Sequence, residues 1–371
     1  MEGRVFERAS TMDIFDSNLN PMSVLIKTRN QAIDSVFYDT GSLTYEEWLS
    51  LSPWVDKKGK IIVVSPSGSV SPEGKPKTIR HYESPEEFLL TDDWRNIVAI
   101  AIAGVGSSVI GTAALARTVA DACRDDVAGI VSGYGASDVA LEGMGGWFFY
   151  GKIDQFRYEM QAALEDVSAI VSSNFADGAN VKPLLRKYFD TPLDAYVPTN
   201  PDVSALHDIL LARYVQDDEA KKLRLLVGHS KGNLLISSVL NHMSYSLRSA
   251  HKTKDPFRNL AVVTLGAVVD IPNDMILEEN QYQFLGTLDV LGRMNSRAIG
   301  GDIARRTPIP GVWHSLNTKL PGHMDAKKLL EEKVIPRLPI PTAVRGAEVQ
   351  PVSELRRNRV AAAIRAMANS N

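Results

Sequence analysis

The stretch that decides the fold covers residues 223–235 and reads LRLLVGHSKGNLL. It opens with a mostly apolar run typical of a buried strand, and from Gly232 onward the apolar residues follow a helical spacing. Between the two lies Gly228-His229-Ser230-Lys231-Gly232, which fits the pattern G-x-S-x-G. A strand that passes through this pattern into a helix predicts a sharp, strained turn on which the Ser230 hydroxyl stands clear of the sheet edge. The two glycines remove side chains that would clash with the helix and with the neighbouring strand.

Outward from this turn, strand and helix patterns alternate along much of the chain. Apolar runs predict strands at 60–65, 97–103, 127–131, 223–227, 260–265 and 283–285, and helical spacing predicts helices at 109–124, 232–247 and 325–333. Repeated strand–helix units predict an α/β fold with a doubly wound, mostly parallel sheet. Ligands of such sheets bind at the carboxyl ends of the strands, so those loops are where we look for a site.

The chain divides into five predicted segments. They are an N-terminal extension at 1–60, the first half of the core at 61–135, an inserted helical cap or lid at 136–221, the second half of the core at 222–340, and a basic C-terminal helical tail at 341–371. Within the cap, residues 154–173 and 203–217 have helical patterns, and residues 143–150 read GMGGWFFY. This glycine-rich apolar segment is typical of a buried element; alternatively, it would line an acyl pocket or touch a lipid surface.

Composition narrows the class of protein. The 371 residues carry 41 Lys+Arg against 44 Asp+Glu, a net charge of −3, and 44% of them are apolar. These values are those of a soluble globular chain, and they give no basic face for a nucleic acid. One cysteine, Cys123, excludes an intrachain disulfide. Because the N-terminal residues show no signal-peptide pattern, we expect a cytoplasmic protein; the sequence leaves export without a cleaved signal open.

A serine hydroxyl needs a base to become a nucleophile, and the base needs an acid to orient it. On the G-x-S-x-G pattern the acid and then the histidine should follow the serine along the chain. Asp289 in GTLD is our preferred acid, with Asp270 as the alternative. His323 in PGH, in a loop just before the terminal helix, is our preferred base over His314 in GVWHS, which we expect at a strand end.

With these residues the chain resembles the α/β-hydrolase fold superfamily of serine esterases and lipases. VGHSKGN at 227–233 is similar to the GHSxG turn of lipases, including the lipase class 3-like group. GTLD at 286–289 and PGH at 321–323 are similar to the acid turn and the base loop of that superfamily. The resemblance covers residues 97 to 335 and leaves the first 60 residues and the cap unexplained. It departs at Asn233, where a further glycine is common, and the HG-type oxyanion motif is absent.

An oxyanion hole needs two backbone N–H donors. Lys231, the residue after Ser230, supplies one, and Val105 or Gly106 in the loop AGVGSS supplies the other, with the Ser107 or Ser108 hydroxyl as an added donor. The same loop has a rival interpretation as a loosened dinucleotide fingerprint, G-x-G-x-x-x-x-G. We expect no metal site, because the histidines are scattered and there is one cysteine.

The sequence thus predicts a cofactor-free carboxylic ester hydrolase in which Ser230, His323 and Asp289 form a triad and an acyl-enzyme. The resemblance implies a substrate with an apolar acyl part, a small-molecule or lipid ester, with a peripheral lipid-surface contact through the cap as one mode of access. Three alternatives stay open: a binding protein without hydrolysis, a thioesterase, amidase or acyltransferase using the same side chains, and a nucleotide-dependent enzyme.

Overall fold

A computed structural model describes residues 34–51, 59–104, 107–132, 201–215, 223–249, 257, 259–296 and 306–338. Eight strands of this described part form one sheet. In spatial order they are β2 (Arg80–Tyr82), β1 (Ile61–Val64), β4 (Val127–Ile130), β3 (Ala99–Ile102), β5 (Leu225–His229), β6 (Ala261–Leu265), β7 (Gln281–Gly286) and β8 (Arg306–Ile309). β1 runs antiparallel to β2 and β4, and every pair from β4 to β8 is parallel. The predicted α/β class with a mostly parallel sheet is therefore confirmed.

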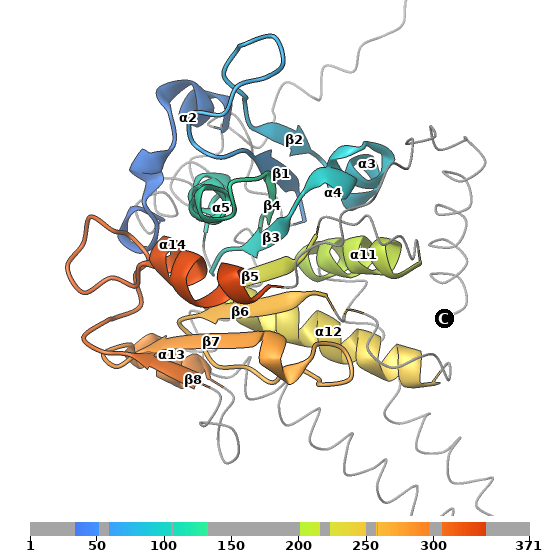
Figure 1. The fold of residues 1–371 in the computed structure, drawn as a ribbon, viewed down its shortest axis with the longest axis vertical. Helices are drawn as coiled ribbons and strands as arrows, with labels where there is room; N and C mark the ends of the chain where they lie inside the picture. The colour runs from blue at the N-terminus through green and yellow to red at the C-terminus, as the bar shows by residue number, and fades with distance from the viewer. Residues whose placement is uncertain are drawn as a thin grey trace, which may run out of the picture.

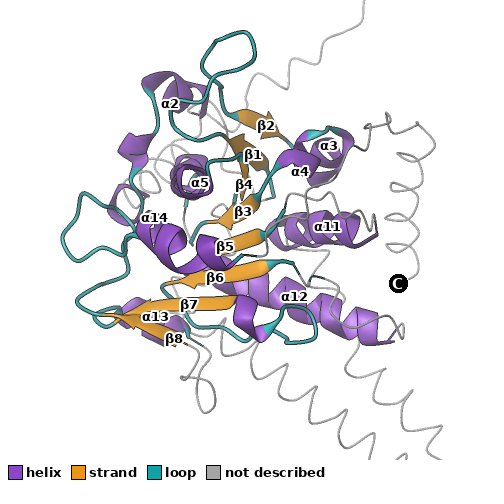
Figure 2. Ribbon diagram, viewed as in Figure 1, coloured by secondary structure: helices purple, strands orange, loops and turns teal. Residues whose placement is uncertain are grey.

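Helices cover both faces of this sheet (Figures 1 and 2). One face carries α2 (Tyr45–Leu51), α5 (Val109–Cys123) and α14 (Ala326–Leu329), and the other carries α3 (Pro85–Leu90), α4 (Asp93–Asn96), α11 (Pro201–Val215) and α12 (Lys231–Ser249). The short α13 (Val290–Asn295) follows β7, and α14 continues into a π-helical turn at Leu330–Val334. None of the helices in the described ranges combines the length and the apolar character needed to cross a membrane.

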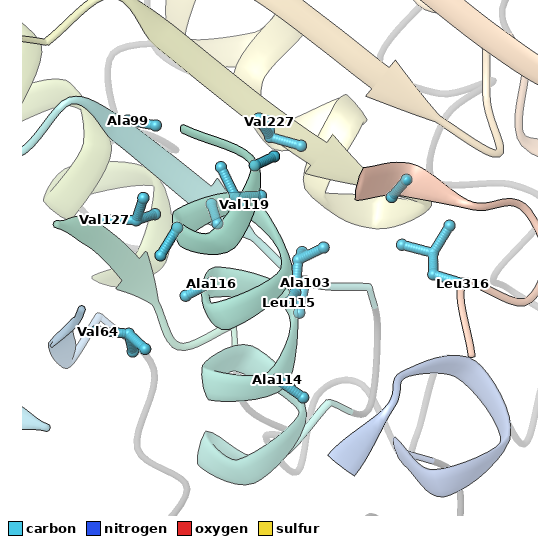
Figure 3. Packing of buried hydrophobic residues seen from close by; sticks show 14 of the residues in the cluster. Val64, Ala99, Ala103, Ala114, Leu115, Ala116, Val119, Val127, Val227 and Leu316 are labelled. Atoms are coloured by element: carbon cyan, nitrogen blue, oxygen red, sulfur yellow. The ribbon is translucent and has the colours of Figure 1, made fainter. Parts of the chain in front are cut away.

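The strand residues divide between two apolar clusters, because successive side chains of a strand point to opposite faces. In β3, Ala99 and Ala101 face the cluster under α5, whereas Ile100 and Ile102 face the cluster under α11 and α12. Small side chains on the first face let α5 lie close to the sheet. Figure 3 shows Ala116 and Val119 of this helix directed at the strand residues. The first cluster is thus built on alanine and valine, and the second on larger aliphatic side chains.

The predicted core strands and helices occur close to their expected ranges, and the main differences among them concern β2, β8 and α11. β2 and β8 are too short and too exposed to give an apolar run, so the sequence did not reveal them. α11, which we predicted as part of the cap, packs on α12 as a core helix: Leu206 and Leu210 share a cluster with Val239. The rest of the predicted cap, including 143–150 and 154–173, and the tail at 341–371 lie outside the described residues.

The predicted N-terminal extension is also corrected, because residues 34–51 belong to the core. Tyr38 and Leu51 are buried in the cluster that contains α5. Glu47 of α2 and Arg117 of α5 form a buried ion pair. Asp34, Ser35 and Val36 also take part in long-range contacts described below. The first described residues are therefore held by polar anchors as much as by apolar ones, and polar anchors leave no periodic pattern in a sequence.

Leu51 and Leu49 offer a matched test of this placement. Leu51 is fully buried, whereas Leu49 on the same helix is 48% exposed. Leu51→Ala should lower the free energy of unfolding by about 2–5 kcal/mol through lost burial and a cavity, and Leu49→Ala should change it by less than about 1 kcal/mol. Urea unfolding followed by circular dichroism measures both. Equal, small effects from the two variants would contradict a core role for this segment.

Candidate active site

Ser230 lies at the turn between β5 and α12, at the carboxyl end of a central strand. Its backbone φ is +53°, in the left-handed region that a side chain other than glycine rarely adopts. The Ser230 N–H donates a hydrogen bond to the Leu265 carbonyl at the end of the neighbouring β6. The sharp, strained turn predicted from G-x-S-x-G is therefore present, and it lies at the edge of the sheet where ligands of such folds bind.

Both glycines of the pattern are required by close packing, as predicted. A Cβ on Gly228 would lie 2.5 Å from Asn233 Oδ1 and 2.8 Å from the Asn233 N, in the first turn of α12. A Cβ on Gly232 would lie 2.1 Å from the Ile102 carbonyl oxygen at the end of β3. Asn233 is fully buried, and its amide donates to the Leu265 carbonyl at 2.8 Å. The residue at which the chain departs from the lipase pattern thus helps to tie α12 to β6.

Asp289 and His314 form a buried pair beside this turn. The His314 Nδ1 lies 2.8 Å from both carboxylate oxygens of Asp289, so we assign a proton to Nδ1 and the lone pair to Nε2. The pair packs against Gly266, which has a φ of +70° at the end of β6: a Cβ there would lie 3.0 Å from His314 Cε1 and 3.3 Å from Asp289 Oδ2. In this tautomer Nε2 has a lone pair that can take up a proton, as a general base requires.

The structure reverses our preference for His323. His323 Nδ1 lies 2.6 Å from the Leu320 carbonyl, within its own turn, and it is His314 that contacts Asp289. The reason is the unpredicted β8, which ends at Ile309 and leaves His314 five residues beyond the strand, in the loop at the carboxyl edge. The prediction favoured His323 for its loop position before the terminal helix, and it expected His314 at a strand end; instead His314 lies in the loop beyond β8.

The preferred acid lies where a short helix begins. Asp289 is the N-cap of α13 and accepts a hydrogen bond from the Gly292 N–H at 2.5 Å while it also contacts His314. A carboxylate at a helix N-terminus is favoured electrostatically. The alternative acid, Asp270, is exposed, and its carbonyl accepts a hydrogen bond from Ser237. Asp289 is thus the acid that the structure brings to a histidine.

His229, directly before Ser230, joins the site to a residue of the N-terminal segment. Its Nδ1 lies 2.8 Å from the Tyr38 hydroxyl, and its Nε2 lies 3.1 Å from the backbone carbonyl of His314. The rings of His229 and His314 lie 4.8 Å apart, centroid to centroid. The sequence analysis assigned no role to either residue. His229 was treated only as a variable position of the G-x-S-x-G pattern, and nothing in the sequence links Tyr38 to the turn 191 residues later.

Burial decides the charge of His229. Burial holds the pKa of this histidine well below the ordinary value of 6.5, and the nearby charge of His314 lowers the pKa further. The hydrogen bond to the His314 carbonyl acts in the opposite direction and raises the pKa. Burial also raises the pKa of Tyr38 above its ordinary value of 10.0, so its hydroxyl keeps its proton. A neutral histidine and a protonated tyrosine can form one continuous hydrogen-bonded chain.

The loop after β3 is anchored by a buried carboxylate. Asp34 accepts hydrogen bonds from the Ser107 hydroxyl at 2.8 Å and from the N–H and hydroxyl of Ser108 at 3.0 and 2.5 Å. Both hydroxyls that we considered as oxyanion donors are therefore engaged by Asp34. Val105 and Gly106, the predicted second donors, lie outside the described residues. Lys231, the predicted first donor, is the opening residue of α12, and its ammonium lies 3.9 Å from Asp202.

The same carboxylate bears on the nucleotide interpretation. Phosphate groups bind at helix N-termini because of the N–H groups and the helix dipole. At α5 that position is held by Asp34, whose charge repels a phosphate. Burial raises the pKa of the Cys123 thiol to about 12, which disfavours a reactive thiolate there. Among the described residues no group of three or more potential metal ligands occurs.

In comparisons with known proteins, no family model, no curated protein and no solved structure matches this chain. A functional assignment therefore depends on the residues and their geometry.

The neutral, buried His229 predicts an acid-sensitive stability. The unfolded chain takes up a proton at this histidine near pH 6.5 and the folded protein does not, so the free energy of unfolding falls as pH drops below about 6.5. The contribution is at most about 1.4 kcal/mol per pH unit. His229→Gln should flatten the dependence measured by urea unfolding between about pH 7 and about pH 5. His323→Gln, outside this network, controls for the loss of one histidine; parallel curves for wild type and His229→Gln would contradict the assignment.

Proposed function

We propose that the chain is a serine hydrolase of the α/β-hydrolase type that cleaves carboxylic esters, with Ser230 as nucleophile, His314 as base and Asp289 as acid. The observation that carries the proposal is the bifurcated contact of His314 Nδ1 with both carboxylate oxygens of Asp289, beside a strained serine turn. The three residues follow one another along the chain in the order Ser, Asp, His, as the G-x-S-x-G pattern requires.

In the proposed reaction, the Ser230 hydroxyl attacks the ester carbonyl while His314 Nε2 takes its proton. Asp289 stabilises the protonated imidazole, which then gives the proton to the departing alcohol. The acyl group stays on Ser230 as an acyl-enzyme. Water, deprotonated by the same histidine, releases the acid. The Ser230 hydroxyl makes no hydrogen bond to His314 among the described contacts, and such bonds tighten in many hydrolases only when substrate is bound.

Charge that develops on the carbonyl oxygen requires N–H donors. The N–H of Lys231 follows the nucleophile at the start of α12, where the helix dipole favours negative charge. No acidic residue lies in the first turn of that helix to oppose it. The second donor remains the predicted Val105 or Gly106, which lie outside the described residues; Gly104, directly before them, is close to the serine turn, since a Cβ on Gly104 would lie 3.3 Å from the Ser230 Cβ.

The apolar acyl part of the substrate is supported by the residues beside Asp289. Leu288, Val290 and Leu291 are 62%, 66% and 42% exposed, although aliphatic side chains of this size are more often buried. They flank the acid at the carboxyl end of β7. An aliphatic chain that leaves the reacting carbonyl would find an apolar surface there. A thioester, an amide or a second acyl acceptor would use the same triad, and the choice among them depends on the leaving group.

A hydrolysis-free binding protein is the second candidate, and the missing hydrogen bond between Ser230 and His314 favours it. The two proposals differ in whether the serine becomes a nucleophile. Labelling separates them, because a phosphonate reagent reacts with a serine only where a base activates it.

Labelling with a fluorophosphonate probe, read by intact mass, should give a single adduct on wild type and none on Ser230→Ala. His314→Gln and Asp289→Asn should slow labelling by about 100-fold or more, because they remove the base or its orienting partner. His323→Gln is the matched control and should label at the wild-type rate. A folded wild-type protein without an adduct would favour the binding protein, and loss of labelling in His323→Gln alone would reinstate that residue as base.

Leu288→Ser tests the apolar substrate preference. It should lower kcat/KM for a decanoyl ester about 3- to 10-fold relative to an acetyl ester, in proportion to about 1 kcal/mol of lost apolar contact. Leu90→Ser is the control, since Leu90 on α3 is equally exposed at 62% and lies away from the site. Equal effects of Leu288→Ser on both esters would place the acyl chain elsewhere.

A further inference from the structure

The loop that carries His314 is tied to the N-terminal segment by three direct hydrogen bonds. The Ser315 hydroxyl donates to the Val36 carbonyl at 2.7 Å, and the Leu316 N–H donates to the Phe37 carbonyl at 2.8 Å. The Asn317 amide donates to the Ser35 carbonyl at 2.6 Å. Residues 35–37 therefore lie against residues 315–317, although about 280 positions separate the two segments. Residues 315–317 directly follow the proposed base.

A fourth connection runs through side chains and reaches the turn at Ser230. The Gly104 N–H donates to the Tyr38 hydroxyl oxygen at 2.6 Å. Because the His314 carbonyl can only accept, the proton of His229 lies on Nε2, and Nδ1 accepts from the Tyr38 hydroxyl. The chain of hydrogen bonds thus runs from Gly104 through Tyr38 and His229 to the backbone of His314, and every group in it donates or accepts in one consistent direction.

The rings around this chain are packed against it. The Phe37 and His314 rings pack in a T-shaped arrangement with 5.7 Å between their centroids, and the Tyr38 and His229 rings do so at 5.3 Å. Tyr38 and His229 are 3% and 1% exposed, so water does not compete for their hydrogen bonds. A buried tyrosine hydroxyl with two partners has one position, and it fixes the position of whatever it contacts.

We propose that Tyr38 is a positioning residue for this site: through His229 it holds the backbone of His314, and hence the base, against the serine turn. The inference rests on the proposed function, because it names what aligns the proposed base. It also explains why Asp34 and Tyr38 are buried beside a site formed otherwise by the ends of β3, β5, β7 and β8. Tyr38 touches no reacting atom, so its loss should weaken proton transfer and leave substrate binding nearly unchanged.

Tyr38→Phe keeps the ring and removes only the hydroxyl. Its rate of fluorophosphonate labelling, and kcat for an ester, should fall about 10-fold, with KM within about twofold of wild type. Tyr82→Phe is the matched control, because the Tyr82 hydroxyl is also partly buried and bonded, to Asp93, at the far edge of the sheet. Both variants are compared well below their unfolding temperatures, so that lost stability does not enter the rate.

If Tyr38→Phe does not fold, two substitutions at His229 test the same positioning role. His229→Gln retains an amide donor toward the His314 carbonyl and should recover part of the rate that His229→Leu loses. In ¹⁵N-detected spectra of the wild-type protein, His229 should be the neutral tautomer with its proton on Nε2. That proton should exchange slowly with water.

The outcomes separate the two proposals. Wild-type labelling together with Tyr38→Phe labelling at the wild-type rate would overturn the positioning role alone, and so would a proton on His229 Nδ1. A folded wild-type protein that takes no label would overturn the proposed hydrolase and this inference with it. A slow Tyr38→Phe beside an unchanged Tyr82→Phe is the result that supports the assignment.

Discussion

The close approach of α12 to β3 is the constraint on which the site depends. At Gly232 the helix backbone comes so near the Ile102 carbonyl that a Cβ would lie 2.1 Å from it, and the turn before the helix is left-handed at Ser230. A backbone in this region is strained by about 1–3 kcal/mol and persists only where its surroundings fix it. Because α12 is seated this closely, the end of β3 and the serine turn meet, and one tyrosine hydroxyl can reach both Gly104 and His229.

Buried hydrogen bonds also hold the backbone around the strained turn in place. A buried donor or acceptor without a partner costs about 1–3 kcal/mol, so a polar chain inside a core restricts the protein to the arrangement in which each group is paired. Here the chain extends from Gly104 to the His314 carbonyl, and a separate set joins Asp34 to Ser107 and Ser108. Both sets start in residues 34–38. The segment without an apolar pattern thus determines the geometry at the sheet edge.

The contrast between β5 and β8 shows how much the sequence reveals. Strands buried on both faces, such as β3 and β5, are continuous apolar runs, and the helices after them follow a clear apolar spacing; with the G-x-S-x-G turn these sufficed to predict the fold class and the place of Ser230. β8, with Arg306 and Pro308 in a four-residue edge strand, has no such run. Without β8 the loop that carries His314 could not be located, and the preference for His323 depended only on its place before the terminal helix. Tyr38 was beyond reach for a different reason: its contacts are hydrogen bonds across the whole chain, and these leave no periodicity.

Among the helices that begin at the carboxyl edge of the sheet, α5 and α12 differ in the charge near their N-termini. α5 follows β3, and its first N–H groups face the buried carboxylate of Asp34 and the Ser108 cap. α12 follows β5, and neither an acidic residue in its first turn nor an acidic cap opposes negative charge there. An anion that approaches this edge therefore meets the buried carboxylate of Asp34 at the start of α5, whereas at the start of α12 the neighbouring carboxylate, Asp202, lies 3.9 Å from the Lys231 ammonium. For a transient oxyanion formed at Ser230 this asymmetry is favourable, whereas a bound diphosphate would need the position that Asp34 holds. The same carboxylate that anchors the N-terminal segment thereby favours acyl chemistry over nucleotide binding at this site.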